Sequence, residues 1–262
     1  MANTLGTAMG SGPAEGRNGS YFGITYNPQK NDKITDFTSP GTFNPDPANT
    51  PGAAEVFVFG GGGSGNSGIA GVCYGGGGGA GSATDGGSGL PISTTFGSPQ
   101  PVTVGGGGST SSIGPISEGG GNSGSSCSGG NNADYNGGSG PGPGFAGGGG
   151  AGSTHNGYPG NDPDPVKGRG GDGTDCTPFG IESSPGNFIF AGGGGSMRGP
   201  LNAGTGNNTG SGGNGGGEAG GNSGWPGRVM VKEAGYGPLE NTSGVWPLQA
   251  QYIYKGQGNW TS

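Results

Sequence analysis

The sequence predicts a mostly irregular fold, a sandwich or lattice of short polyglycine II helices framed by a few short β-strands, with little or no α-helix. Two observations predict it. Glycine supplies 76 of the 262 residues and proline 21, far above the usual shares of about 7% and 5%. Strand-like segments also lie beside glycine runs, as in "EVFVFGGGG", where residues 55–59 lead directly into glycines 60–63.

The glycine runs themselves are expected to form the core. Hydrophobic residues make up only 26% of the chain, too few for a conventional interior. A glycine chain in the polyproline-II conformation has three residues per turn and no internal hydrogen bonds, so neighbouring chains must satisfy its backbone groups. Any Cβ at the contact would force the chains apart. Gly77 and Gly148, which belong to runs, are therefore expected in the core, whereas Gly137 is expected in an exposed loop. The runs are 60–63, 75–79, 105–108, 119–121, 147–150, 192–195 and 215–217.

Flexible Gly/Ser linkers are the alternative interpretation of these runs. Linkers seldom carry strand-like flanks, and this chain has them at residues 102–104, 188–190 and 229–231. A strict Gly-X-Y register is missing, so a collagen helix is disfavoured.

Three regions are expected along the chain. Residues 1–50 form an N-terminal attachment region with a strand over 21–26 and a second near Ile34, or they complete the sheet that frames the glycine domain. Residues 51–235 form the glycine-rich polyglycine-type domain, and residues 236–262 form a C-terminal docking or cap segment.

The order of the motifs resembles a known family. The segments "EVFVFGGGGSG", "CYGGGGGAGS", "PVTVGGGGS", "GFAGGGGAGS", "NFIFAGGGGS" and "GWPGRVMVK", within residues 53–232, look like the glycine-rich domain of virion proteins of tailed bacteriophages, notably tail-fibre and fibre-tip proteins. The resemblance implies a polyglycine core that displays loops for host receptor binding.

The C-terminal segment carries a second resemblance. "SGVWPLQAQYIYKGQGNW", residues 243–260, is similar to a G-V-W-x-L-x-x-Q-Y signature on structural proteins of marine phages, cyanophages among them. Pro247 suits the first turn of a short helix, with Leu248 and Tyr252 on one face. The segment is expected either to cap the last strand or to make an assembly contact through Trp246, Leu248, Tyr252 and Trp260.

Several other functions are disfavoured. The start "MANTLGTAMGSG" has no basic-then-apolar leader, and no stretch approaches the roughly 20 apolar residues that span a bilayer. Nine basic against sixteen acidic residues give no patch for nucleic acid. With His155 as the single histidine and no P-loop, no catalytic residues and no cofactor are expected.

Two further features of the sequence are its three cysteines and one acidic stretch. Cys73, Cys127 and Cys176 are an odd number without a CxxC motif and are expected to be free thiols rather than disulfide or zinc ligands. The carboxylates of Asp162, Asp164, Asp172 and Asp175 could supply calcium ligands. Structural turns with a local ion pair to Lys167 or Arg169 are favoured instead, so no metal site is expected.

The function expected is that of a non-enzymatic phage tail-fibre or fibre-tip protein. Its receptor would be a bacterial surface glycan or outer-membrane protein, contacted by loop aromatics, namely Tyr135, Phe145, Tyr158 and Phe179. A capsid or tail decoration protein that serves assembly and stability is the alternative, and an ice-binding polyglycine protein is a third. Other virion proteins are the expected partners. The chain is also expected to form a homo-oligomer, for which a trimer is one form. It is expected in the virion, after synthesis in the host cytoplasm and release by lysis.

Overall fold

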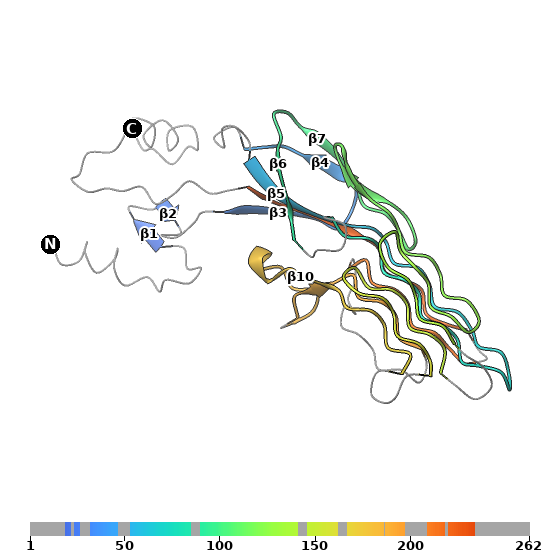
Figure 1. Cartoon of the computed structure of the whole chain (residues 1–262). Coiled ribbons are helices and arrows are strands. Elements are labelled where there is room, and N and C mark those ends of the chain that lie inside the picture. The colour runs from blue at the N-terminus through green and yellow to red at the C-terminus, as the bar shows by residue number, and fades with distance from the viewer. Residues whose placement is uncertain are drawn as a thin grey trace.

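The structure, a computed structural model, consists of short antiparallel strands and long irregular segments (Figure 1). The residues that it describes are 19–21, 24–26, 32–46, 53–84, 90–140, 146–161, 167–185, 187–196, 209–217 and 220–233. Among these residues there is no α-helix, and one 3-10 helix, η1, covers Thr177–Phe179. The predicted C-terminal helix lies outside the described residues.

The predicted strand over residues 21–26 is two strands in the structure. β1 (Gly19–Tyr21) pairs with β2 (Ile24–Tyr26) as an antiparallel hairpin. The sequence between them is Phe-Gly, and glycine is disfavoured inside strands. The second predicted strand is confirmed as β3 (Lys33–Phe37).

Two four-stranded antiparallel sheets frame the glycine runs. The first has the order β3, β12 (Arg228–Glu233), β5 (Ala53–Phe59), β6 (Ile92–Thr95). The second has the order β4 (Gly41–Phe43), β7 (Gln100–Thr103), β8 (Ser111–Ile113), β9 (Ile116–Glu118). Since β3 and β4 belong to these sheets, the segment 33–43 completes the frame, which is one of the two roles expected for the N-terminal region.

The first hydrophobic core lies between the two sheets. Val56 and Val58 of β5 point to this side, and the second sheet contributes Val102 and Ile113. Phe43 also belongs to this core, where its ring meets that of Phe96 edge-on at 5.4 Å. Burial of these side chains joins the two sheets.

A second core covers the opposite face of the first sheet, where β10 (Thr174–Asp175), η1 and β11 (Ile189–Phe190) lie (Figure 1). Phe57 meets Phe179 at a ring separation of 5.0 Å, and Phe59 stacks on Phe190 at 5.5 Å. β5 is therefore buried on both faces, which explains its nearly continuous apolar sequence.

The glycine runs leave the strands side by side and form a connected hydrogen-bond network (Figure 1). We call the following segments the glycine network: 60–68, 74–82, 119–131, 146–152, 192–196 and 209–217. Its proximal end adjoins the strands, since Gly60 directly follows β5. There the Gly60 amide donates to the Ser82 carbonyl. Its distal end lies beyond the bond from Asn66 to Gly76, where the chain reverses.

The amides of residues 76–82 show how the segments are arranged. They donate in turn to three neighbouring segments, 119–125, 148–151 and 210–213, and the direction repeats at every third residue. The bonds run from Gly76 to Ser125, Gly77 to Gly148, Gly78 to Gly213, Gly79 to Asn122, Ala80 to Ala151, Gly81 to Gly210 and Ser82 to Gly119. Two neighbours thus run antiparallel to this segment and one runs parallel.

Side chains are excluded where the segments meet. A Cβ on Gly77 would overlap the Gly194 carbonyl, and one on Gly148 would overlap the Gly138 carbonyl. The expectation that Gly137 lies in an open loop is wrong, because a Cβ there would overlap the backbone of Gly129. Gly106, in contrast, has open space around the Cβ position although it belongs to a run of four glycines.

We predict that Gly77→Ala and Gly148→Ala each destabilise the protein by about 3 kcal/mol or more, since a rigid carbonyl must move to admit the methyl group. Thermal and urea unfolding followed by circular dichroism measure this. Gly106→Ala is the matched control, and its unfolding free energy should equal that of the wild type. Equal stability of all three variants would show that the runs are linkers.

Candidate functional site

The structure brings together two of the predicted receptor-binding residues. The Gly157 amide donates to the Asn136 carbonyl at 2.9 Å, so the segments that carry Tyr135 and Tyr158 are neighbours. Both side chains are partly exposed. Phe145 lies outside the described residues, as do all four predicted assembly residues, Trp246, Leu248, Tyr252 and Trp260.

Phe179 does not belong to a surface. Its side chain is 1% exposed and packs against Phe57 in the second core. The prediction that Phe179 contacts a receptor is therefore wrong. The sequence "CTPFGIE" has the residues of a turn, and the turn is present as η1, but its aromatic ring points inwards.

Arg169 connects Tyr158 to two further polar side chains, Asp172 and His155. The Arg169 guanidinium lies over the Tyr158 ring, 5.5 Å from its centre, and bonds the Asp172 carboxylate at 2.6 Å. The His155 Nδ1 lies 3.7 Å from the same carboxylate. We call this region the side surface and define it as Tyr135, Asn136, His155, Asn156, Tyr158, Arg169 and Asp172.

Short turns hold the side surface in place. The Asn132 Oδ1 accepts the Tyr135 amide at 2.7 Å, and the Asn132 side-chain nitrogen donates to the Gly152 carbonyl at 2.9 Å. The Asn156 Oδ1 accepts the Asn136 amide at 2.8 Å. These Asn bonds tie the surface turns to the glycine network and so limit their motion.

The acidic stretch contains the local ion pair that the sequence favoured, between Arg169 and Asp172. Hydrogen bonds from the Thr177 hydroxyl and amide lower the pKa of Asp175. Asp162 and Asp164 lie outside the described residues, and the described part of the chain holds no cluster of three metal-ligating side chains.

His155 has a hydroxyl and a carboxylate beside it, but not in the order of a catalytic triad. Thr154 Oγ1 lies 3.1 Å from the His155 Nδ1, the same nitrogen that faces Asp172. A triad places the nucleophile and the acid on opposite ring nitrogens.

In the described ranges no helix is long and apolar enough to cross a bilayer.

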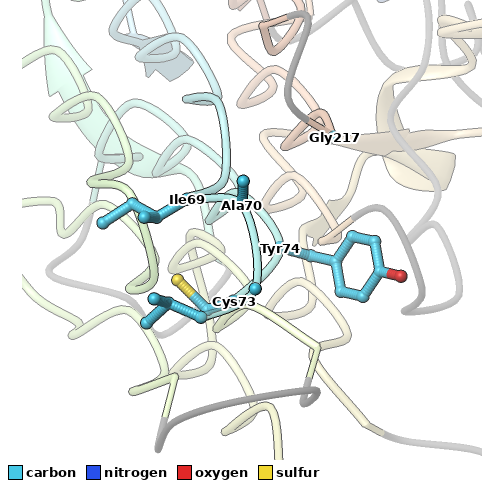
Figure 2. Close-up of a pocket in the computed structure, with 7 residues that line it drawn as sticks. Ile69, Ala70, Cys73, Tyr74 and Gly217 are labelled. Atoms are coloured by element: carbon cyan, nitrogen blue, oxygen red, sulfur yellow. The ribbon is translucent and has the colours of Figure 1, made fainter.

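A second surface lies at the distal end of the network. Residues 69–74, the distal loop, form a tight reversal in which Ile69 and Cys73 exchange backbone hydrogen bonds of 2.9 and 3.1 Å. Ile69 is 48% exposed and Val72 is 40% exposed. Figure 2 shows Ile69 and Tyr74 on opposite sides of this loop, with Gly217 beside it.

The prediction of three free thiols is wrong for two of them. Cys73 and Cys127 form a disulfide, with Cα atoms 5.6 Å apart and a sequence separation of 54. It joins the distal loop to the turn at residues 125–128, in which the Ser125 amide donates to the Ser128 carbonyl. Cys176 is free and fully buried, and burial raises the pKa of its thiol well above the usual range.

Neither the distal loop nor the disulfide was predicted from the sequence. One signal was present, since Cys73 and Cys127 each lie in a short non-glycine break between glycines. Neither spacing nor composition shows that the two breaks meet.

No protein-family model, curated protein or solved structure matches this chain.

One carboxyl group at the proximal end has a shifted pKa. Burial, and then the neighbouring charge of Asp134, raise the pKa of Glu118 to about 7. Glu118 is the last residue of β9 and precedes Gly119, whose carbonyl accepts a hydrogen bond from the Ser82 amide. The ionised form is therefore disfavoured where the second sheet meets the glycine network.

The disulfide should stabilise the distal end. Replacing both cysteines, Cys73→Ser with Cys127→Ser, should cost about 2–4 kcal/mol of unfolding free energy, because the crosslink restricts the unfolded chain. It should also speed amide hydrogen exchange in residues 68–74. The wild type in dithiothreitol should match the double variant, on which the reductant should have no effect. Unchanged exchange after reduction would contradict a role for the crosslink in ordering this loop.

The pKa of Glu118 predicts a pH dependence of stability. Because the folded state raises this pKa from 4.5 to about 7, the protonated group contributes stability below pH 4.5 that is lost as the pH rises through 7. Solvent screening at this half-buried group reduces the effect to about 1 kcal/mol. Between about pH 4.5 and about pH 8, the Tm of the wild type should therefore fall by about 3 °C more than that of Glu118→Gln. Scanning calorimetry measures both, and identical pH profiles would refute the assignment.

Proposed function

We propose that this protein is a non-enzymatic virion protein of a tailed bacteriophage, a tail-fibre or fibre-tip protein that presents loops to the host surface. The observation that carries the proposal is that backbone hydrogen bonds hold the glycine network together. The side chains of its turns are then available for binding. The resemblance of residues 53–232 to phage glycine-rich domains supports the same function.

The glycine segments in this proposal are polyglycine II helices. Donor directions that repeat at every third residue support it, because this helix type has three residues per turn. The Cβ positions of Gly77 and Gly148, occupied by carbonyl oxygens of neighbouring segments, support it as well. Residues 60–69, at about 3.1 Å each, would carry the distal loop roughly 30 Å beyond the strands.

Receptor contact would take place at the side surface, with Tyr135 and Tyr158 as its aromatic residues. Tyrosine supplies a large contact area at a modest entropy cost. The C-terminal residues Trp246, Leu248, Tyr252 and Trp260 would serve assembly with other virion proteins or with further copies of this chain. A decoration protein of the capsid or tail is the alternative, and it requires no receptor contact.

We predict that Tyr135→Ala combined with Tyr158→Ala lowers binding of the purified protein to host cells at least tenfold, which corresponds to about 1.4 kcal/mol. The Tm should change by only a few degrees, because neither ring belongs to the two hydrophobic cores. Flow cytometry with labelled protein measures the binding.

Ile69→Ser combined with Val72→Ser is the matched comparison at the distal loop. A larger loss for this pair would move the receptor contact to the distal end. Wild-type protein that binds no cells, together with normal adsorption of virions that lack it, would favour the decoration function instead.

A further inference from the structure

We propose that the side surface binds a neutral, hydroxyl-rich saccharide. This inference rests on the proposed function, and it selects a glycan rather than an outer-membrane protein as the receptor. Three properties of the side surface carry it: alternating donors and acceptors, a charge that is internally paired, and an aromatic ring among polar groups.

Donors and acceptors lie next to one another on the side surface. The Asp172 carboxylate is 37% exposed and accepts hydrogen bonds, whereas the Arg169 guanidinium, 29% exposed, only donates them. His155 is 62% exposed and can do either, and the Asn156 amide does both. A sugar hydroxyl also donates and accepts at once, so it matches this mixture. A phosphate would need donors alone, and a cation would need acceptors alone.

The charges of the side surface compensate each other. Arg169 is bonded to Asp172 at 2.6 Å, and the whole chain carries a net charge of −7. An anionic ligand would have to compete with Asp172 for the guanidinium in an overall repulsive field. A neutral ligand meets neither obstacle, since it can bond to the pair without separating it.

The aromatic content also fits a sugar better than a protein partner. Tyr158 has an apolar ring and a polar tip, a combination suited to the C–H and O–H groups of a pyranose. The buried core of a protein interface is apolar, and its Tyr, Trp and Arg anchors pack among further apolar contacts that exclude water. The large hydrophobic side chains exposed in the described residues are Ile34, Ile69, Val72 and Leu90, and none belongs to the side surface.

The groups are held in position before any ligand arrives. The Tyr158 amide bonds the Arg169 carbonyl at 2.9 Å, and the Gly149 amide bonds the Tyr158 carbonyl at 3.0 Å. The backbones of Tyr158 and Arg169 are thus tied to each other and to the glycine network. Such preorganisation reduces the entropy lost on binding and favours weak, polar ligands.

The test uses cells of a panel of Gram-negative bacteria, untreated, oxidised with periodate, or digested with proteinase K. Periodate cleaves vicinal diols and so destroys saccharide receptors. We expect periodate to abolish binding and proteinase to leave it intact. Immobilised polysaccharide from the bound strain should bind the wild type. Asp172→Asn and Arg169→Gln should each weaken that binding at least tenfold, with a Tm within a few degrees of the wild type.

Glu182→Gln, which also removes an exposed carboxylate, is the control and should bind like the wild type. Binding that survives periodate but is lost after proteinase would overturn the saccharide inference while leaving the receptor-binding function intact. Polysaccharide binding that Asp172→Asn and Arg169→Gln leave unchanged would overturn the assignment to the side surface. Failure to bind any untreated cell would refute the proposed function together with this inference.

Discussion

The structure depends on the hydrogen bond between the backbones of neighbouring glycine segments. Because each segment bonds neighbours in three directions, most positions leave no room for a Cβ, as the carbonyl oxygens next to Gly77 and Gly148 show. Each amide in this interior still needs an acceptor, and the network supplies one from a different neighbour at successive residues. Glycine is thus required here for its missing side chain, and cohesion that usually comes from apolar burial comes from the main chain.

The hydrophobic residues have a limited but necessary task, which is to start the network in register. β5 is buried on both faces and continues directly into Gly60, while β12 begins at Arg228, after the last glycines of the glycine-rich region. These two strands pair antiparallel along their length, so they clamp both ends of the glycine-rich region. The buried Arg228 also bonds Asp36 of β3 through its Nε at 2.7 Å, which compensates for burying its charge. Two small cores therefore suffice, because they organise the proximal end and the backbone bonds do the rest.

This division of labour explains how such a chain could serve recognition. Side chains that lie in turns, such as those of the side surface, contribute little to the interior and can change without disturbing it. The distal loop is the exception, since the Cys73–Cys127 disulfide joins its side chains covalently to another turn. Turns held by backbone bonds lose little entropy on binding, which suits the proposed recognition of a ligand by few residues.

The sequence by itself determined the local features: the strands at 55–59 and 229–231, the absence of α-helix in the described residues, the structural use of glycine, and a local ion pair in the acidic stretch. It did so because alternation, glycine content and short-range charge spacing act over a few residues. Only the tertiary structure decided which glycine run lies beside which, since runs of identical glycines carry no pairing information. That arrangement joined Cys73 to Cys127, turned Phe179 into the core, closed the space around Gly137, and brought the segments of Tyr135 and Tyr158 together. Each of these depends on contacts between segments distant in the chain, and the sequence encodes them only through the fold as a whole.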